Sequence, residues 1–252
     1  MKIITYNVNG IRSAIKKGFA EWLKIENPDV VCIQETKAQP EQIESQLFKN
    51  IGYDTYSFSA KKKGYSGVAI LTKLKPDKIV NGIGIDKFDD EGRFIRADFG
   101  DISVISTYFP SGSNENRQAI KMEYLDAFRI YVNELKKERP KLVISGDYNI
   151  CRLWIDIHNP EKQQKTSGFL PEEREWFQNF IDDGFVDSYR EFNTEPHNYS
   201  WWSYRAGSRQ RNKGWRIDYN IVTENLKENL KGASILKDVV HSDHCPVCLE
   251  ID

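Results

Sequence analysis

Short apolar runs that end or begin at a carboxylate or an amide recur along the whole chain. Four of them read as β-strands, and their polar neighbours are Asn7 after 2–6, Glu35 after 30–34, Asp147 and Asn149 after 141–146, and Asp243 with His244 before 246–249. A carboxylate at a sheet edge has to be solvated, paired or bound to a metal ion, so packing alone does not explain these positions. The pattern indicates a layered β structure with polar chemistry at its strand ends.

The size and charge of the chain narrow the possibilities. Its 252 residues, of which 39% are hydrophobic and 29% charged, suffice for a large core, and we expect residues 1–252 to form a single domain. The formal net charge of -1 means that any binding of nucleic acid depends on a local concentration of positive charge. The apolar run at the N-terminus is too short for a signal peptide and no stretch approaches a membrane span, so we expect a soluble, cytoplasmic protein without a membrane partner.

The four cysteines are expected to be reduced, as is usual for an intracellular chain of this size. Cys245 and Cys248 have the spacing of a redox pair or of half a zinc site. They fall in a segment that reads as a strand, where residues three apart point to opposite faces, and no second such pair is present. Buried thiols are therefore the favoured interpretation.

Strand and helix patterns alternate along the chain. Runs rich in Val, Ile and aromatic residues predict strands at 30–34, 68–72, 102–109, 141–145, 217–222 and 246–251. Apolar residues at helical spacing predict helices over 116–137, with Asn114 as its cap and Pro140 beyond its end, and over 172–181, preceded by Pro171. This mixture predicts an α/β fold with helices packed outside a layered sheet core.

Residues 203–214 have the composition of a loop, and basic side chains gather there. No acidic residue occurs between 201 and 217, where Arg205, Arg209, Arg211, Lys213 and Arg216 are interleaved with Trp201, Trp202, Tyr204 and Trp215. Basic side chains neutralise phosphates, and flat aromatic rings stack on bases or line a pocket for an exposed sugar. The alternative is a solvated charged loop beside core tryptophans.

The strand-end residues together favour metal-assisted hydrolysis. Oxygens of Asp, Glu and Asn are hard ligands that suit magnesium. The four histidines, His158, His197, His241 and His244, show no H-E-x-x-H pair, and neither a G-x-S-x-G elbow nor a Cys-His pairing is visible. A water nucleophile and a phosphate ester substrate fit best. Each residue taken singly could be a turn residue or a surface carboxylate, so the interpretation depends on their meeting in space.

Several motifs resemble those of one known family. They are Ile33-Gln34-Glu35-Thr36-Lys37, Gly64-Tyr65-Ser66-Gly67-Val68-Ala69, Gly146-Asp147-Tyr148-Asn149 with Asp156-Ile157-His158-Asn159-Pro160, Gly214-Trp215-Arg216-Ile217-Asp218-Tyr219, and Ser242-Asp243-His244. In their order and spacing they are similar to exonuclease III and its apurinic/apyrimidinic endonuclease relatives over nearly the entire chain. Single motifs also occur in the wider endonuclease, exonuclease and phosphatase superfamily, whereas the segments 64–67 and 215–218 point to its DNA-repair branch.

The resemblance implies a DNase I-like fold and a set of residue roles. The expected fold is an α/β four-layer sandwich in which two facing mixed β-sheets are flanked by helices, with the active site at one end of the sheets. The catalytic residues would be Tyr108, Asp147, Asn149, Asp218 and His244, and the metal site would draw on Asn7, Glu35, Asp147, Asn149, Asp243 and His244. DNA would be bound by Arg205, Arg209, Arg211, Lys213, Trp201, Trp215 and Ile217.

The same resemblance implies an activity. The chain is expected to be a Mg²⁺-dependent phosphodiesterase, with Mn²⁺ as a substitute, that cuts double-stranded DNA 5' to abasic sites and leaves a 3'-hydroxyl. Blocked 3' ends would also be substrates, through 3'-to-5' exonuclease and 3'-end-cleaning activity, and the protein would act as a monomer. Asp147 would activate or orient the attacking water, while His244, fixed by Asp218 in its protonated form, would contact the scissile phosphate as a hydrogen-bond donor.

Two rival readings differ from this one in identifiable features. A phosphatase or phosphodiesterase acting on lipid or nucleotide phosphates would share the metal site but lack the basic, tryptophan-rich loop. A non-catalytic DNA-binding module would keep the loop and need none of the acids. Two positions also depart from the family pattern. Asn9 stands where some relatives have aspartate, which predicts weaker cation affinity, and Arg152 stands where histidine is common, which bears on local DNA contacts.

Overall fold

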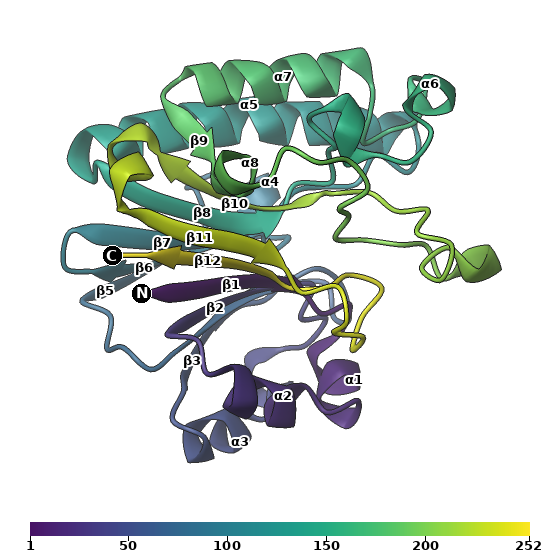
Figure 1. Cartoon of the computed structure of the whole chain (residues 1–252). Helices are drawn as coiled ribbons and strands as arrows, with labels where there is room; N and C mark the ends of the chain where they lie inside the picture. Colours follow the sequence, from purple (N-terminus) through teal and green to yellow (C-terminus); the bar gives the residue numbers. More distant parts are fainter.

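The central strands are apolar on both faces, and the fold buries both faces. In the computed structural model, which describes residues 1–252, two six-stranded sheets pack against each other and helices cover their outer sides (Figure 1). Along the first strand Ile3 faces the opposite sheet and Ile4 faces the helices, while Val143 and Ile144 alternate in the same way in the second sheet. Continuous apolar strands are expected where a sheet is covered on both sides.

Both sheets are mixed. The first has the order β11-β12-β1-β2-β4-β3, formed by β11 (Leu230–Ile235), β12 (Val247–Ile251), β1 (Lys2–Asn7), β2 (Val30–Gln34), β4 (Val68–Thr72) and β3 (Asp54–Phe58). The second has the order β5-β6-β7-β8-β10-β9, formed by β5 (Lys78–Asn81), β6 (Phe94–Phe99), β7 (Ile102–Tyr108), β8 (Lys141–Asp147), β10 (Asp218–Thr223) and β9 (Phe185–Asp187). The pairs β1–β2 and β7–β8 are parallel, and all the others are antiparallel.

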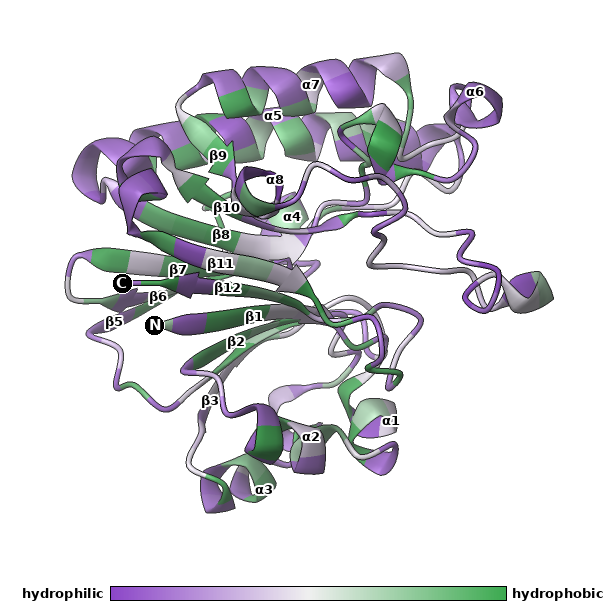
Figure 2. Ribbon diagram, in the orientation of Figure 1, coloured by the Kyte–Doolittle hydropathy of each residue, from purple (hydrophilic) through white to green (hydrophobic).

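The helices form the outer layers. The α-helices are α1 (Ile11–Lys16), α2 (Phe19–Glu26), α3 (Ser45–Asn50), α4 (Asp86–Asp89), α5 (Glu115–Glu138), α6 (Pro160–Gln163), α7 (Pro171–Asp182) and α8 (Ser188–Phe192). Short 3₁₀ turns occupy Pro40–Gln42, Trp154–Asp156, Arg205–Gly207 and Glu224–Asn229. Helices α1, α2 and α3 cover the first sheet, while α5 and α7 cover the second (Figure 1). Hydrophobic colour runs along the strands, and the outer faces of α5 and α7 are largely hydrophilic (Figure 2).

The four-layer α/β sandwich expected from the resemblance is confirmed. The predicted strands and both long helices are present, with ends that differ from the predicted ones by at most two residues. Asn114 caps α5 as predicted, because its side chain accepts a hydrogen bond from the backbone N–H of Arg117 at 3.0 Å. All four cysteines are buried free thiols. None of the helices combines the length and the apolar character that crossing a bilayer requires.

Strand pairing brings distant parts of the chain to one end of the sandwich. Asn7, at the end of β1, pairs with Gln34, the residue before Glu35. In the second sheet Asp147 lies between Tyr108 on β7 and Asp218 on β10. Because β12 runs antiparallel to β1, the residues just before β12 lie beside the end of β1. The polar strand ends identified in the sequence therefore meet at one edge.

Candidate active site

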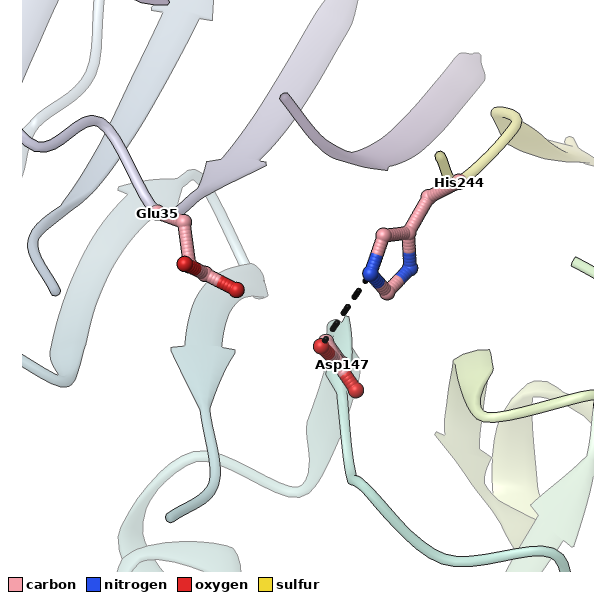
Figure 3. Close-up of side chains that lie close together, drawn as sticks. All are labelled: Glu35, Asp147 and His244. Atoms are coloured by element: carbon pink, nitrogen blue, oxygen red, sulfur yellow. Dashed lines mark ion pairs between the residues drawn. The ribbon is translucent and has the colours of Figure 1, made fainter. Parts of the chain in front are cut away.

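Three side chains from distant elements converge at this edge. Ligand atoms of Glu35, Asp147 and His244 all lie within 4.8 Å of one another, and Figure 3 shows the three side chains around a common space. Asn7 joins the two sheets, since its amide donates to Glu35 Oε1 at 2.9 Å and to Asp147 Oδ2 at 2.8 Å. The convergence that the sequence interpretation required is thus present.

The backbone is unusual at two of the site residues. Glu35 and Asn149 have φ angles of 51° and 52°, a left-handed conformation that residues other than glycine seldom adopt. At Asn149 this turn lets the backbone N–H donate to Asp147 Oδ1 at 2.9 Å while the side-chain amide donates to the Phe109 carbonyl at 2.9 Å. Such backbone strain persists where the surrounding contacts enforce it, and it is frequent at active sites.

His244 is fixed by a carboxylate that is itself held in place. The Nδ1 atom of His244 lies 2.9 Å from Asp218 Oδ2, and the hydroxyl of Ser200 donates to the same oxygen at 2.6 Å. This leaves Nε2 facing the site, 3.9 Å from Asp147 Oδ2 (Figure 3). That separation is longer than a hydrogen bond, so His244 Nε2 and Asp147 Oδ2 do not bond to each other.

The protonation of the site follows from this geometry. Burial by itself lowers the pKa of His244, but the adjacent Asp218 carboxylate prevails and raises it to about 10. Burial and the nearby Asp218 carboxylate raise the pKa of Asp147 to about 7. The site therefore contains an imidazole that keeps its proton and faces a carboxyl group that is more basic than usual, which are the properties of an acid and a base.

A second chain of contacts leads from Glu35 to the C-terminal segment. Lys37 Nζ lies 2.7 Å from Glu35 Oε2 and donates to Asn9 Oδ1 at 2.5 Å. Asn9 in turn donates to Asp243 Oδ1 at 2.9 Å, and the indole of Trp201 donates to Asp243 Oδ2 at 3.1 Å. Burial opposes the ionised form of Glu35, but Lys37 and Asn7 lower its pKa overall. An aspartate in place of Asn9 could not donate to Asp243, so the amide suits this chain of contacts.

A cavity of about 310 Å³ is lined by Glu35, Asp147, Asn149, Asp243 and His244. Its polar side includes Tyr108, whose pKa is raised well above the usual value by burial and by the Glu35 carboxylate. Its apolar side consists of Trp201, Trp215 and Ile217, and the two indole rings meet edge to face at 5.7 Å. The cavity thus places an apolar wall directly beside the acidic groups.

The basic residues of the 201–217 region separate into three kinds. Arg205, Arg211 and Lys213 are exposed, and Arg209 is half-buried. Arg216 is fully buried and bonded to Asp156 and Asp187, so it is unable to meet a phosphate. Arg152 lies apart from the cavity and bonds Gln178 at 3.2 Å.

Sequence reasoning missed several residues of the site. Ser111, Gly112, Ser113 and Ser167 line the cavity, and Ser200 supports Asp218. Lys121, buried on α5 with Glu173, donates to the Asn149 carbonyl at 2.9 Å and so supports the strained turn. The only signal for Ser111 and Ser113 was their place after the 102–109 strand, and nothing in the sequence marked Ser167 or Ser200. A single lysine in a long helical pattern carries no signal of burial.

The donor set fits a hard divalent cation. Glu35 and Asp147 supply carboxylate oxygens and His244 supplies a ring nitrogen. The Asn7 amide directs its N–H group at the two carboxylates, and its oxygen accepts the Asn9 N–H at 3.0 Å. Magnesium binds through one or two carboxylates and keeps waters for substrate phosphate, and a cluster without cysteine and with one histidine is poorly suited to zinc. The cluster can therefore hold a metal ion.

Comparison with known proteins places these features in a family. A model of the Endonuclease/Exonuclease/phosphatase family matches residues 4–244. The chain belongs to this family. An exodeoxyribonuclease of Bacillus subtilis is 43% identical over all of both chains, and a DNA-(apurinic or apyrimidinic site) endonuclease of Dictyostelium discoideum is 39% identical over all of this chain and 71% of its own length.

Solved structures of the family share the fold. An AP endonuclease from Archaeoglobus fulgidus superposes with a TM-score of 0.91 at 31% identity, covering 100% of this chain and 99% of the other. A 3' phosphatase from Neisseria, bound to a product DNA hairpin, superposes with a TM-score of 0.90 at 28% identity over 100% and 99% of the two chains. The family resemblance inferred from the motifs is confirmed.

Proposed function

We propose that this protein incises duplex DNA 5' to abasic sites, leaves a 3'-hydroxyl, and also removes nucleotides and blocking groups from 3' ends. One observation carries the proposal. Glu35, Asp147 and His244 meet at a cavity whose other wall is formed by Trp201, Trp215 and Ile217. Hydrolytic groups and an apolar wall in one cavity fit a phosphodiester next to a sugar that has lost its base. We further propose that residues 1–252 act as one catalytic domain.

In the proposed reaction, water attacks phosphorus in line with the 3' oxygen. Asp147 takes a proton from the water as the new P–O bond forms, a role that suits a carboxyl group with a pKa near neutrality. The bond from phosphorus to the 3' oxygen breaks, and this oxygen leaves as a hydroxyl by taking a proton from a solvent water. The phosphate stays on the 5' side, attached to the abasic sugar.

Other side chains stabilise the charge and hold the reactants. The imidazolium of His244, aligned by Asp218, donates to a non-bridging phosphate oxygen on which negative charge grows. Tyr108 lines the cavity and offers its hydroxyl to the phosphate or to the departing oxygen, while Asn149 helps to hold the water. A Mg²⁺ or Mn²⁺ ion held by Glu35 and neighbouring oxygens, including those proposed from Asn7 and Asp243, would offset the charge of the phosphate.

Exposed groups next to the cavity are proposed to contact the duplex. Arg205, Arg211 and Lys213 lie on the 203–213 loop, which extends away from the sheets as the yellow-green segment of Figure 1. Their charges would neutralise phosphates of the strand that enters the cavity. Every site residue comes from one chain, so we propose that a monomer is sufficient; light scattering of the active fraction tests this.

The proposal is tested by offering purified protein four substrates with Mg²⁺ or with a chelator. They are an abasic duplex, a duplex with a recessed 3' end, a duplex with a 3'-phosphate, and a phosphoinositide. We expect cleavage of the DNA substrates in Mg²⁺ only, and a loss on the order of 10²- to 10⁴-fold in the Asp147→Asn variant. Asp101→Asn, which alters an exposed carboxylate, is the matched control and should retain the wild-type rate.

Cleavage of the abasic duplex at an unchanged rate in the chelator, or in Asp147→Asn, would remove the proposed mechanism. Turnover of the phosphoinositide alone would instead assign the protein to the phosphatases of the same family. The rates on the three DNA substrates rank the activities, which share one set of catalytic groups.

A further inference from the structure

The basic residues expected to contact DNA have unequal surroundings. The side chains of Arg205 and Lys213 are exposed and form no hydrogen bond or ion pair within the protein. Arg211, also exposed, donates only to the Ala206 carbonyl of its own loop. Arg209 is half-buried, and its guanidinium is bonded to another part of the chain. Three cations of this loop are therefore free to contact a phosphate, and the fourth, Arg209, is bonded to another segment of the protein.

The partners of Arg209 are backbone carbonyls. Its Nη1 donates to Ser242 O at 3.1 Å, and its Nη2 donates to Lys237 O at 2.8 Å and to Val239 O at 2.6 Å. The guanidinium also lies over the ring of Trp202, at 4.6 Å from its centroid. All three carbonyls belong to the irregular segment 236–243, which connects β11 with β12. Arg209 thus fastens the DNA-facing loop to this segment.

The segment 236–243 needs such attachments, because it belongs to neither sheet. Near its end the Trp202 N–H donates to the Asp243 carbonyl at 3.0 Å, and on its other side Lys17 donates to the His241 carbonyl at 3.0 Å. The ring of His241 packs among Tyr6, Phe19 and Trp22. In addition to these attachments, Arg209 is the donor for three carbonyls of the segment that would otherwise lose their protein partner.

This segment ends at Asp243 and His244, two residues of the candidate site. Ser242, whose carbonyl accepts from Arg209 Nη1, also donates its hydroxyl to Asp243 Oδ1 at 3.1 Å and accepts the His244 N–H at 3.3 Å. A shift of Ser242 would therefore move both residues. Hydrogen bonds through Ser242 and the covalent chain thus link Arg209 to His244 without a gap.

We propose that Arg209 is a positioning residue and not a phosphate contact: it sets Asp243 and His244 relative to the loop that meets DNA. The reaction that this positioning serves is the proposed function above, whereas the contacts of Arg209 do not depend on that function. A planar guanidinium bridges several acceptors at fixed angles, which a lysine ammonium on a flexible stem does not reproduce. Arg209 is therefore expected to be intolerant of lysine, whereas a contact that supplies only charge tolerates it.

Three variants separate the two roles. Arg209→Gln and Arg211→Gln each remove one positive charge from the same loop, and Arg209→Lys keeps the charge while removing the fork. Binding of a double-stranded DNA fragment is measured in chelator at several salt concentrations. Loss of one phosphate contact reduces the slope of log K against log salt by about 0.9. We expect this reduction for Arg211→Gln and an unchanged slope for Arg209→Gln.

Activity provides the second readout. In single-turnover cleavage of an abasic duplex, Arg209→Gln and Arg209→Lys should both lower the rate at saturating DNA by about 10²-fold, the typical effect of a small misplacement of catalytic groups. The DNA concentration for half-maximal rate should stay unchanged. Recovery of the wild-type rate in Arg209→Lys would mean that Arg209 contributes only charge, and the inference would be overturned.

Hydrogen–deuterium exchange supplies a readout that needs neither activity nor the glutamine variant. In Arg209→Lys the amides of 236–244 should exchange faster than in the wild type, while those of β8 should not change. Wild-type protection over 236–244, or a slope change in Arg209→Gln equal to that of Arg211→Gln, would refute the positioning role. A wild-type protein that leaves abasic DNA uncut would refute the proposed function, and exchange and slope would still decide the role of Arg209.

Discussion

Two clusters of buried charge flank Ile217 along the chain, and they are built in opposite ways. On one side Arg216 bonds Asp156 Oδ1 at 2.8 Å and Asp187 Oδ2 at 2.6 Å, and Arg190 adds another bond to Asp156. On the other side Asp218 faces Asp147 across the β8–β10 pairing, with a single imidazole between them. We call these the arginine cluster and the catalytic cluster.

The two clusters affect their carboxylates differently. Burial raises the pKa of any carboxyl group, but in the arginine cluster Arg216 and Arg190 outweigh it and lower the pKa of Asp156. In the catalytic cluster, burial and the like charge of Asp218 act together and raise the pKa of Asp147. Buried acids with matched cations are held in one charge state, whereas acids in excess over cations are poised to change it. Charge balance, more than burial, distinguishes the arginine cluster from the catalytic cluster.

The largest effect is expected from breaking the arginine cluster. Arg216→Met leaves Asp156 and Asp187 buried with fewer cationic partners, and removing one member of a buried ion pair costs about 3–5 kcal/mol. The free energy of unfolding, measured in urea, should fall by that amount. Arg152→Met is the control, because Arg152 lies 3.6 Å from Asp187 and is not its main partner, so the loss should be clearly smaller than for Arg216→Met. Equal losses in the two variants would mean that the cluster is not organised around Arg216.

Asp218→Asn tests the catalytic cluster by the opposite criterion. The amide keeps the shape of the carboxylate but no longer favours the imidazolium of His244, so single-turnover cleavage should fall by about 10²-fold or more. The stability loss should stay below that of Arg216→Met, because the substitution also relieves repulsion with Asp147 and the imidazole can become neutral. A stability loss as large as that of Arg216→Met would show that both clusters are structural and would break the comparison.

The pH dependence of stability sharpens the contrast. The unfolded chain ionises Asp147 near pH 3.9, and the folded protein does so only near its raised pKa of about 7. The free energy of unfolding therefore falls as pH rises from 3.9 to 7, because the folded protein resists the ionisation of Asp147. In metal-free buffer Asp147→Asn should gain stability relative to the wild type as pH rises through this interval, measured by urea unfolding at several pH values. For Asp156, whose pKa is lowered, the sign reverses: its stabilisation is present above pH 3.9 and is lost on acidification.

The layered fold was predictable because the sequence encodes it locally. Strands such as 141–145 are apolar on both faces, and α5 shows a helical stripe after the capping Asn114. The four-layer arrangement came from the family resemblance, since periodicity does not reveal which sheets face each other. Strand ends were shifted by one or two residues, as at β8, because polar residues such as Asp147 continue the ladder.

The site was predictable in its residues but less so in their roles. Asn7, Glu35, Asp147 and His244 were found from their places at strand ends. Basic composition alone could not separate Arg209 and Arg216 from the exposed Arg211, because the difference lies in long-range contacts with carbonyls or buried carboxylates. Lys121 escaped notice for the same reason, as its partner Glu173 lies on another helix.

The smallest effect is expected at Lys37, the side-chain cation of the catalytic cluster that a metal ion can replace. Lys37 pairs with Glu35 at 2.7 Å, but its side chain is 34% exposed, whereas that of Arg216 is 1% exposed. A partly exposed pair contributes about 1 kcal/mol, so a divalent cation can take the place of the ammonium beside Glu35. Lys37→Met should therefore tighten Mg²⁺ binding about 2- to 5-fold in a calorimetric titration.

Lys16→Met provides the matched control for Lys37→Met. Lys16 lies on the same surface groove as Lys37 and forms no ion pair, so its loss tests the general effect of one charge. Because screening by water and salt weakens charges that lack direct contact, the change in Mg²⁺ affinity should be smaller than for Lys37→Met. Weaker Mg²⁺ binding in Lys37→Met would show that Lys37 holds Glu35 in its binding position. The catalytic cluster would then resemble the arginine cluster in relying on a fixed cation, and the distinction between them would rest on exposure alone.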